Sequence, residues 1–317
     1  MITVQELTKR YDGKPAVDNL TFQVVPGQVT GFLGPNGAGK STTLRAIVGL
    51  DRPDVGRALI QGRPYAALPH PLREVGAMLN AKAVHPARSA RNHLLALART
   101  NGIPARRVDE VLSIVGLTTV AGKKAGTFSL GMGQRLGIAA ALLGDPPILI
   151  FDEPINGLDP DGIRWLRGLV RTLADEGRTV FFSSHVVSEM QLTADHLIVI
   201  GRGRLVADGP ADDLIGAAGG VVTVRSPDEA GLSSLQGDLE GRRFETTRMS
   251  AHHLEIIAAP IELVADLTYA GRLRIHELSR TDGSLEDAYL RLTASSSEYD
   301  AGGPTPGRHN DRTETPA

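Results

Sequence analysis

The stretch from Gly34 to Ser41 constrains the fold more than any other part of this sequence. It reads G-x-x-x-x-G-K-S, follows the apolar run 29–33, and precedes the segment 41–50, whose apolar residues have helical spacing. A strand, a glycine-rich loop and a helix in this order form a cradle for phosphate groups, because successive backbone N–H groups point into one nest and the helix N-terminus adds its dipole. The alternative is a glycine-rich turn without a ligand, which the complete pattern between strand and helix disfavours.

The cradle needs particular residue types at particular places. Gly34, Gly37 and Gly39 permit positive φ and a close approach of the backbone to phosphate. Lys40 is expected to reach the β and γ phosphates as a point charge, and the hydroxyl of Ser41 to ligate Mg²⁺. The predicted ligand is therefore a nucleotide with its magnesium ion.

Length and composition limit the other possibilities. A chain of 317 residues predicts one large domain with a smaller one attached. The 34 Lys and Arg and 36 Asp and Glu give a net charge of −2, so there is no global basic field to bind nucleic acid, and the lack of cysteine excludes disulfides and thiolate chemistry. The N-terminus lacks the features of a signal peptide, and no window approaches the roughly 18 to 20 apolar residues that span a bilayer. We therefore expect a soluble, cytoplasmic protein.

An aromatic residue, Tyr11, lies upstream of the phosphate loop, just before a turn at 12–15 that separates predicted strands at 2–7 and 20–25. An aromatic ring at this position could stack on a nucleotide base. Taken alone, such a tyrosine is more often a packing residue, so both interpretations stand at this point.

The middle of the chain changes from strand to helix patterns. Strands are predicted at 57–62 and 74–79, the second ending at Asn80. From 85 to 141 the apolar residues follow helical spacing, at 94, 95, 97 and 98 and again at 108, 111, 112 and 115. We interpret this segment as a helical insertion.

Two carboxylates follow the apolar run 148–151, which is typical of a parallel strand buried on both faces. An acidic pair at the carboxyl end of a buried strand is costly unless a cation or substrate lies there. Asp152 fits as the Mg²⁺ partner of Ser41, and Glu153 as the group that orients or deprotonates an attacking water. The alternative is a pair of solvated loop acids.

Three further stretches complete a pattern: SLGMGQR at 129–135, NGLD at 156–159 and SSH at 183–185. Together with the phosphate loop and the Asp152-Glu153 pair, they resemble, in order and spacing, the ATP-binding subunits of ABC transporters over residues 1 to about 217. Within this family the chain is most similar to the type 2 exporters, which include drug and antibiotic efflux ATPases. The resemblance implies an α/β P-loop ABC ATPase cassette with a mostly parallel sheet, an N-terminal antiparallel subdomain and a helical insertion at about 81–141.

The resemblance also implies roles for single residues. Tyr11 is expected to stack on adenine, 129–132 to hold the γ-phosphate of the ATP bound by the opposite subunit, and His185 to sense that phosphate. A structural histidine is the alternative for His185, and Asp159, expected to bridge the subunits, also begins a plausible helix with Pro160. The expected nucleotide contacts are Tyr11, Gly34, Pro35, Asn36, Gly37, Ala38, Gly39, Lys40, Ser41, Thr42, Asn80, Ser129, Leu130, Gly131, Met132 and Asp159, with Ser41, Asp152 and Asn80 as metal ligands and Glu153 and His185 as catalytic residues.

Two residues depart from the family pattern. Leu130 replaces a glycine of the commonest signature, so its side chain must point away from phosphate. Asn80 replaces the usual glutamine and is one methylene, roughly 1.5 Å, shorter, which puts direct metal contact in doubt.

The composition changes after residue 216. The segment 217–220 reads as a linker, and a small α+β accessory domain is predicted at 218–294, with strands at 221–224, 254–257 and 273–278, a helix at 261–269, and a capping box at 284–287 that opens a last helix. The tail 295–317 has almost no apolar residues and is expected to be disordered.

Three functional hypotheses remain at this stage. The first is an ATPase motor that dimerises, binds a separately encoded membrane permease at the inner face of the membrane, and drives export. The second is a soluble ABC ATPase that acts on ribosomes or DNA ends, although such relatives usually carry two cassettes or a long coiled coil. The third is a P-loop kinase or GTPase, for which the SLGMGQR stretch and His185 would have no purpose. We favour the first and expect no nucleic-acid partner.

Overall fold

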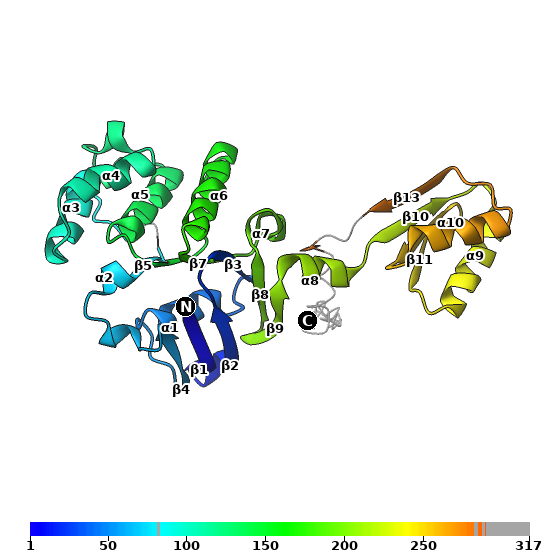
Figure 1. Ribbon diagram of the computed structural model, residues 1–317, viewed down its shortest axis with the longest axis horizontal. Coiled ribbons are helices and arrows are strands. Elements are labelled where there is room, and N and C mark those ends of the chain that lie inside the picture. The colour runs from blue at the N-terminus through cyan, green and yellow to red at the C-terminus, as the bar shows by residue number, and fades with distance from the viewer. Residues whose placement is uncertain (81–82, 282–284, 287–288, 290–317) are drawn as a thin grey trace, which may run out of the picture.

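The computed structural model describes residues 1–80, 83–281, 285–286 and 289 (Figure 1). Its centre is a six-stranded sheet in the order β5-β6-β7-β3-β8-β9, parallel except for β9. Every residue of β6 and β7 is buried, as expected of parallel strands that are covered on both faces. The strands are β3 (Gln28–Leu33), β5 (Val75–Met78), β6 (Ile148–Phe151), β7 (Thr179–Ser184), β8 (His196–Gly201) and β9 (Arg204–Pro210).

A second, antiparallel sheet in the order β2-β1-β4 packs on one face of this core. Its strands are β1 (Ile2–Tyr11), β2 (Lys14–Val24) and β4 (Val55–Ile60). The rings of Phe22, Phe32 and Phe181 join the two sheets, with centroids 5.2 to 5.8 Å apart. Helix α1 (Lys40–Ile47) follows β3, and its buried Leu44 and Ile47 belong to the same hydrophobic cluster.

The opposite face carries helices, which include the insertion between β5 and β6 (Figure 1). The insertion contains α3 (Ala90–Thr100), α4 (Arg106–Ile114) and α5 (Leu130–Leu142), with short 3-10 turns at Thr118–Val120 and Ala125–Thr127. Two more turns of helix, Tyr65–Ala67 and α2 (Pro71–Glu74), lead into β5. Helix α5 begins within the SLGMGQR stretch, because the Ser129 hydroxyl accepts a hydrogen bond from the Met132 N–H and caps it.

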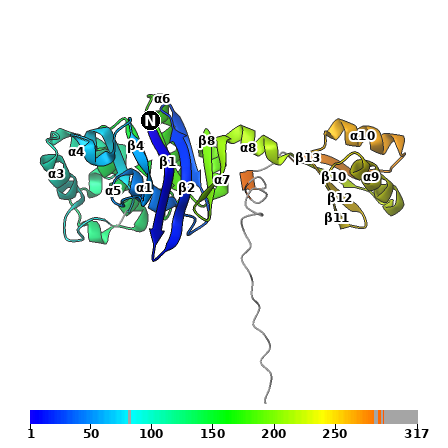
Figure 2. The same ribbon diagram turned by 90° about the horizontal axis from the view of Figure 1, so that it is seen from below.

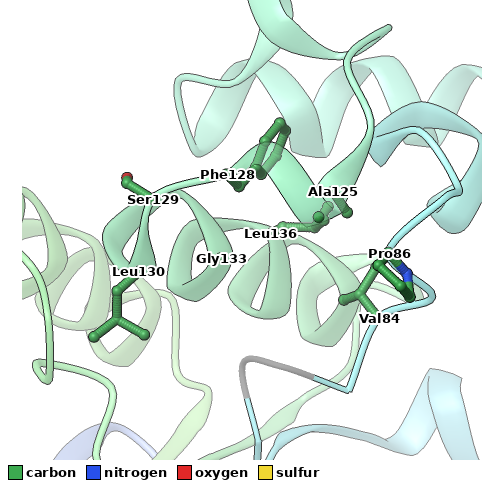
Figure 3. A pocket seen from close by; sticks show the side chains of 9 residues that line it. Val84, Pro86, Ala125, Phe128, Ser129, Leu130, Gly133 and Leu136 are labelled. Carbon is green, nitrogen blue, oxygen red and sulfur yellow. The ribbon is translucent and has the colours of Figure 1, made fainter.

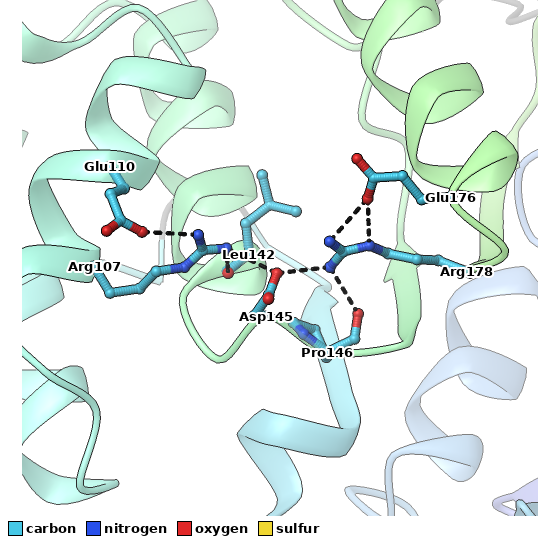
Figure 4. A network of polar contacts seen from close by, with 7 residues as sticks. All are labelled: Arg107, Glu110, Leu142, Asp145, Pro146, Glu176 and Arg178. Atoms are coloured by element: carbon cyan, nitrogen blue, oxygen red, sulfur yellow. Dashed lines mark hydrogen bonds and ion pairs between the residues drawn. The ribbon is translucent and has the colours of Figure 1, made fainter.

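Ion pairs tie this insertion to the central sheet (Figure 4). The Asp145 carboxylate, in the turn after α5, accepts hydrogen bonds from Arg107 on α4 at 3.0 Å and from Arg178 before β7 at 2.9 Å. Glu110 and Glu176 flank the two guanidinium groups, and Arg107 also donates to the Leu142 carbonyl. The network therefore joins α4, the end of α5 and the start of β7.

Helices α6 (Pro160–Asp175), α7 (Val187–Thr193) and α8 (Ala211–Ala218) complete the cassette. Asp159 caps α6 and Pro160 takes its first position, as the sequence predicts. Among the helices of the described residues, none is long and apolar enough to cross a membrane.

The C-terminal part forms a lobe with a hydrophobic cluster of its own, set apart from the cassette beyond α8 (Figures 1 and 2). Its sheet is antiparallel in the order β11-β12-β10-β13, built by a βαββαβ succession. The elements are β10 (Val221–Arg225), α9 (Glu229–Gly241), β11 (Thr246–Ser250), β12 (His253–Ile257), α10 (Ile261–Ala270) and β13 (Glu277–Thr281).

Two expectations for this lobe need correction. The segment read as a linker is half helical, because α8 runs to Ala218. The strand expected at 273–278 is β13, four residues later, and α9 was not predicted. The capping box at 284–287 and the tail 295–317 lie largely or wholly outside the described residues.

Candidate functional site

The phosphate loop joins the carboxyl end of β3 to α1. Gly37 and Gly39 have φ of 82° and 102°, in the left-handed region that glycine adopts without strain. Gly34 is needed for a different reason, since a Cβ there would lie 2.6 Å from the Ile200 carbonyl oxygen of the neighbouring strand. The loop thus places the backbone N–H groups at the start of α1 close together. N–H groups at a helix N-terminus bind anions such as phosphate.

Lys40, the first residue of α1, has a side chain that is only 6% exposed. Its Nζ donates to the Gly34 carbonyl at 2.6 Å and the Pro35 carbonyl at 3.3 Å, and lies 3.2 Å from Glu153 Oε1. A buried ammonium requires such partners. The loop carbonyls and the carboxylate therefore hold the positive charge where the motif places phosphate.

Acidic and polar side chains gather where β6 and β7 end. Ser183 Oγ donates to Asp152 Oδ1 at 2.6 Å and accepts from the Glu153 N–H at 2.9 Å. Glu153 Oε2 lies 2.9 Å from His185 Nδ1, and the Glu153 backbone has a φ of 49°, an uncommon value for a non-glycine residue. Since β3, β7 and β6 are neighbours in the sheet, Lys40, Glu153 and His185 meet at one edge.

The expected metal ligands line one open cavity of about 660 Å³ beside this cluster. Ser41, Asp152 and Asn80 reach it from α1, the end of β6 and the end of β5, and His93 and Leu97 of the insertion form another wall. A hydroxyl, a carboxylate and an amide are the oxygen donors that Mg²⁺ prefers.

Tyr11 lies beside the N-terminal end of α1 and is partly exposed. Its hydroxyl donates to Asp51 at 2.9 Å and interacts with the Thr42 hydroxyl. Burial, and then the hydrogen bond to the carboxylate, raise the pKa of Tyr11, while the hydrogen bonds from Arg45 lower the pKa of Asp51. The ring is thereby fixed at its hydroxyl end next to the phosphate loop, leaving ring surface exposed to solvent.

The signature stretch lies at the start of α5, where Figure 3 shows Ser129 and Leu130. Ser129 and Leu130 line a separate cavity of about 450 Å³, with residues of the insertion and none from the phosphate loop. Leu130 is 49% exposed, and its side chain lies against Gly157, close enough that a Cβ on that glycine would meet it at 2.2 Å. Gly131 is in tight contact with the Gly157 carbonyl, and Met132 packs at the edge of the core.

The structure therefore brings the candidate residues into two groups within one chain. The phosphate loop, Lys40, Ser41, Asp152, Glu153 and His185 converge. Ser129 and Leu130 line a separate cavity, and Gln134 alone of this stretch is seen to bond to the first group, through the Glu153 carbonyl. Asp159 lies beyond both groups as the cap of α6, its carboxylate 2.8 Å from the Gly162 nitrogen.

Sequence reasoning missed three residues of this region. Ser183, which binds Asp152, belongs to the SSH stretch, where only His185 carries an expected role. Asp51 and Gln134 gave no separate signal, because their partners Tyr11 and Glu153 lie 40 and 19 residues away along the chain.

Comparison with known proteins finds the same family throughout. The family model described as ABC transporter matches residues 17–156. The uncharacterised ABC transporter ATP-binding protein YhcH of Bacillus subtilis is 35% identical over 94% of this chain and 97% of its own length. The bacitracin transport ATP-binding protein BcrA of Bacillus licheniformis is 44% identical over 68% of this chain and 71% of its own, and the Nod factor export ATP-binding protein I of Burkholderia pseudomallei is 35% identical over 92% and 96%.

Solved structures match the cassette. The ATP-binding subunit of an ABC transporter superposes with a TM-score of 0.63 and 29% identity over 68% of this chain and 92% of that one. A dimeric structure of the bacterial ABC transporter cassette MJ0796 superposes with a TM-score of 0.61 and 25% identity, over 67% of this chain and 99% of that one. A post-hydrolysis dimer of the same cassette, bound to ADP and phosphate, gives the same values. These structures bear out the expected cassette fold.

Proposed function

This chain belongs to the ABC transporter family of ATP-binding proteins, and we propose that it is the motor subunit that drives a separate membrane-spanning permease for export of a drug, antibiotic or lipid-like compound. One observation carries the proposal. Lys40, Glu153 and His185 lie beside the phosphate loop, at the carboxyl ends of three neighbouring strands. Lys40 Nζ is 3.2 Å from Glu153 Oε1, and Glu153 Oε2 is 2.9 Å from His185 Nδ1. This is where an open α/β sheet binds its ligand.

Each group has a task that its contacts support. Lys40 is held by loop carbonyls, so a phosphate oxygen can replace the Glu153 carboxylate as its counter-charge when ATP binds. Glu153 is then released to accept a proton from the attacking water on its Oε atoms, and His185 orients that carboxylate through Nδ1. The donor set of Ser41, Asp152 and Asn80 would hold Mg²⁺, which neutralises charge on the phosphates.

The base assignment is tested with Glu153→Gln. The amide keeps the size and the hydrogen bonding of the side chain but loses its basic oxygen, so ATP should still bind while turnover falls by roughly 10² to 10⁴. Glu176→Gln, in an exposed turn on the far side of the sheet, is the matched control and should hydrolyse ATP normally. Unimpaired hydrolysis by Glu153→Gln would refute the assignment.

ABC cassettes dimerise, and the finer proposal is a head-to-tail homodimer in which the signature of each chain closes the phosphate loop of the other. The separation of Ser129 from Lys40 within one chain supports this arrangement. The protein should be largely monomeric without nucleotide, and Glu153→Gln should dimerise with ATP and dissociate with ADP. Mixing Lys40→Ala with Ser129→Arg chains should recover some activity, because a mixed dimer has one intact composite site. A Ser129→Arg homodimer that hydrolyses ATP normally would exclude shared sites.

The permease is proposed to dock near Asn80 and the start of the insertion, where the 660 Å³ cavity opens between the insertion and the core. Because the Asn80 amide is one methylene shorter than the usual glutamine, we expect the isolated subunit to hydrolyse ATP slowly and to be stimulated by its partner. Equal rates with and without the permease would argue against coupling. Co-purification of a membrane protein supports transport, and co-purification of ribosomes or nucleic acid would overturn it.

A further inference from the structure

Gln134 connects the signature helix to the loop that carries the candidate base. Its side chain is 5% exposed, and its Nε2 donates to the Asn156 carbonyl at 2.9 Å and to the Glu153 carbonyl at 3.3 Å. Both partners are carbonyl oxygens, which accept only, so the atom that faces them must be the amide nitrogen. Its Oε1 is buried and has no hydrogen-bond partner within the described part of the chain, so the amide interacts there through its two donated bonds.

The Glu153 backbone needs such support. Its φ of 49° belongs to a left-handed conformation that non-glycine residues hold only when their surroundings impose it. The N–H of Glu153 is held by Ser183, and its carbonyl by Gln134 and the Asn156 N–H. Hydrogen bonds to both the N–H and the carbonyl of Glu153 therefore fix the direction of its side chain, which points toward Lys40 and His185.

Gln134 also lies on the face of α5 that bears the signature. Leu130 and Gly131 are one turn earlier on the same face, and both contact Gly157 in the loop that Gln134 binds. A movement of the signature end of α5 is therefore expected to move this loop. The backbone of Gly131 lies close to the Gly157 carbonyl, and the Leu130 side chain packs on Gly157. The Gln134 amide also binds two carbonyls of the same loop.

From these contacts we infer that Gln134 is a positioning residue for ATP hydrolysis, which sets the Glu153 carboxylate according to the position of the signature helix of its own chain. The inference rests on the proposed role of Glu153 as the base. In the proposed dimer, the signature of this chain contacts the ATP of the opposite site. Gln134 would then transmit the occupancy of the opposite site to the base of its own.

The test is a double-mutant cycle in the full-length chain, with single-turnover hydrolysis of MgATP and the affinity for a fluorescent ATP analogue as separate readouts. Gln134→Leu has a similar volume and no donor. We expect its hydrolysis rate to fall about 10- to 100-fold, as for a reacting group misplaced by about 1 Å, with nucleotide affinity within about twofold of wild type. If the leucine variant folds poorly, Gln134→Asn replaces it, because its amide is too short to reach both carbonyls. It should likewise lower the hydrolysis rate and leave nucleotide affinity nearly unchanged.

The decisive comparison is Glu153→Gln with and without Gln134→Leu. If Gln134 acts through Glu153, the double variant is no slower than Glu153→Gln alone. Losses that multiply would overturn the inference. An equal rate loss in Ile138→Val, a buried change one turn further along α5, would overturn it as well. A normal rate in Glu153→Gln would instead remove the proposed base, which is a different failure.

Discussion

The contact between the signature helix and the loop after β6 can be tested by adding one methyl group. Gly131 is helical, and a Cβ built on it lies 2.9 Å from the Gly157 carbonyl oxygen and 3.6 Å from Leu158 Cδ2. Ordinary contacts of a Cβ begin near 3.4 Å. Gly131→Ala therefore requires α5 and the loop to separate by about 0.5 Å, and the atom that must move belongs to the backbone.

The expected magnitude has two parts. Overpacking of a close contact costs about 1–3 kcal/mol, and replacing a helical glycine by alanine gains up to about 1 kcal/mol. Gly168→Ala on α6 is the matched control, because its Cβ meets nothing within 4 Å and only the gain applies. The two variants should differ by the overpacking cost alone, about 1–3 kcal/mol, or roughly 2–12 °C in the midpoint of thermal unfolding.

Thermal unfolding followed by circular dichroism, together with ATP turnover, provides the assay. Gly168→Ala should unfold at a higher temperature than wild type with unchanged turnover. Gly131→Ala should unfold at a lower temperature than Gly168→Ala and turn over ATP about 10- to 100-fold more slowly, because the displaced loop carries Glu153. If both variants were equally stabilised and equally active, the close contact would not exist and the reasoning would be wrong.

Three further predictions concern other parts of the site and its frame. Tyr11→Ala should weaken ATP binding by about 1–3 kcal/mol, roughly 5- to 150-fold, and Tyr11→Phe should retain most of it; equal affinities in a nucleotide titration would contradict stacking. Chelation of Mg²⁺ should abolish hydrolysis, and Asp152→Asn should raise the Mg²⁺ concentration needed to restore it; activity in excess chelator would argue against the proposed ligands. Asp145→Ala should lower the free energy of unfolding by up to about 1 kcal/mol, because that carboxylate is 59% exposed. In denaturant titrations the loss should shrink at high salt. A loss independent of salt would show that the ion pairs are not its cause.

Local sequence pattern was sufficient for most of the cassette. The phosphate loop, the apolar run that became β6, and the Asp159-Pro160 start of α6 could each be predicted, because a turn of helix, a buried strand or a cap depends on residues within a few positions of one another. The convergence of Lys40 with Glu153 could also be anticipated, since parallel strands end at one edge of a sheet. The family was recognised from motif order, and similarity to related sequences and structures confirmed it.

The C-terminal lobe was less predictable. Helix α9 has Leu232, Leu235 and Leu239 at helical spacing, but three glycines weaken the pattern, and its stability comes from packing on the sheet. The strand at 277–281 has few apolar residues, and its pairing with β10 determines its place.

Only the tertiary structure decided which groups act together within the site. The bonds from Gln134 to Glu153 and Asn156 span 19 and 22 residues, and those that join Asp145 to Arg107 and Arg178 span 38 and 33. No local propensity encodes such bonds, because they depend on how α5 docks against the sheet. The sequence determined the chemical groups and the elements that carry them. The packing of those elements determined that Gln134 on the signature helix binds the backbone of Glu153, the candidate base, in its own chain.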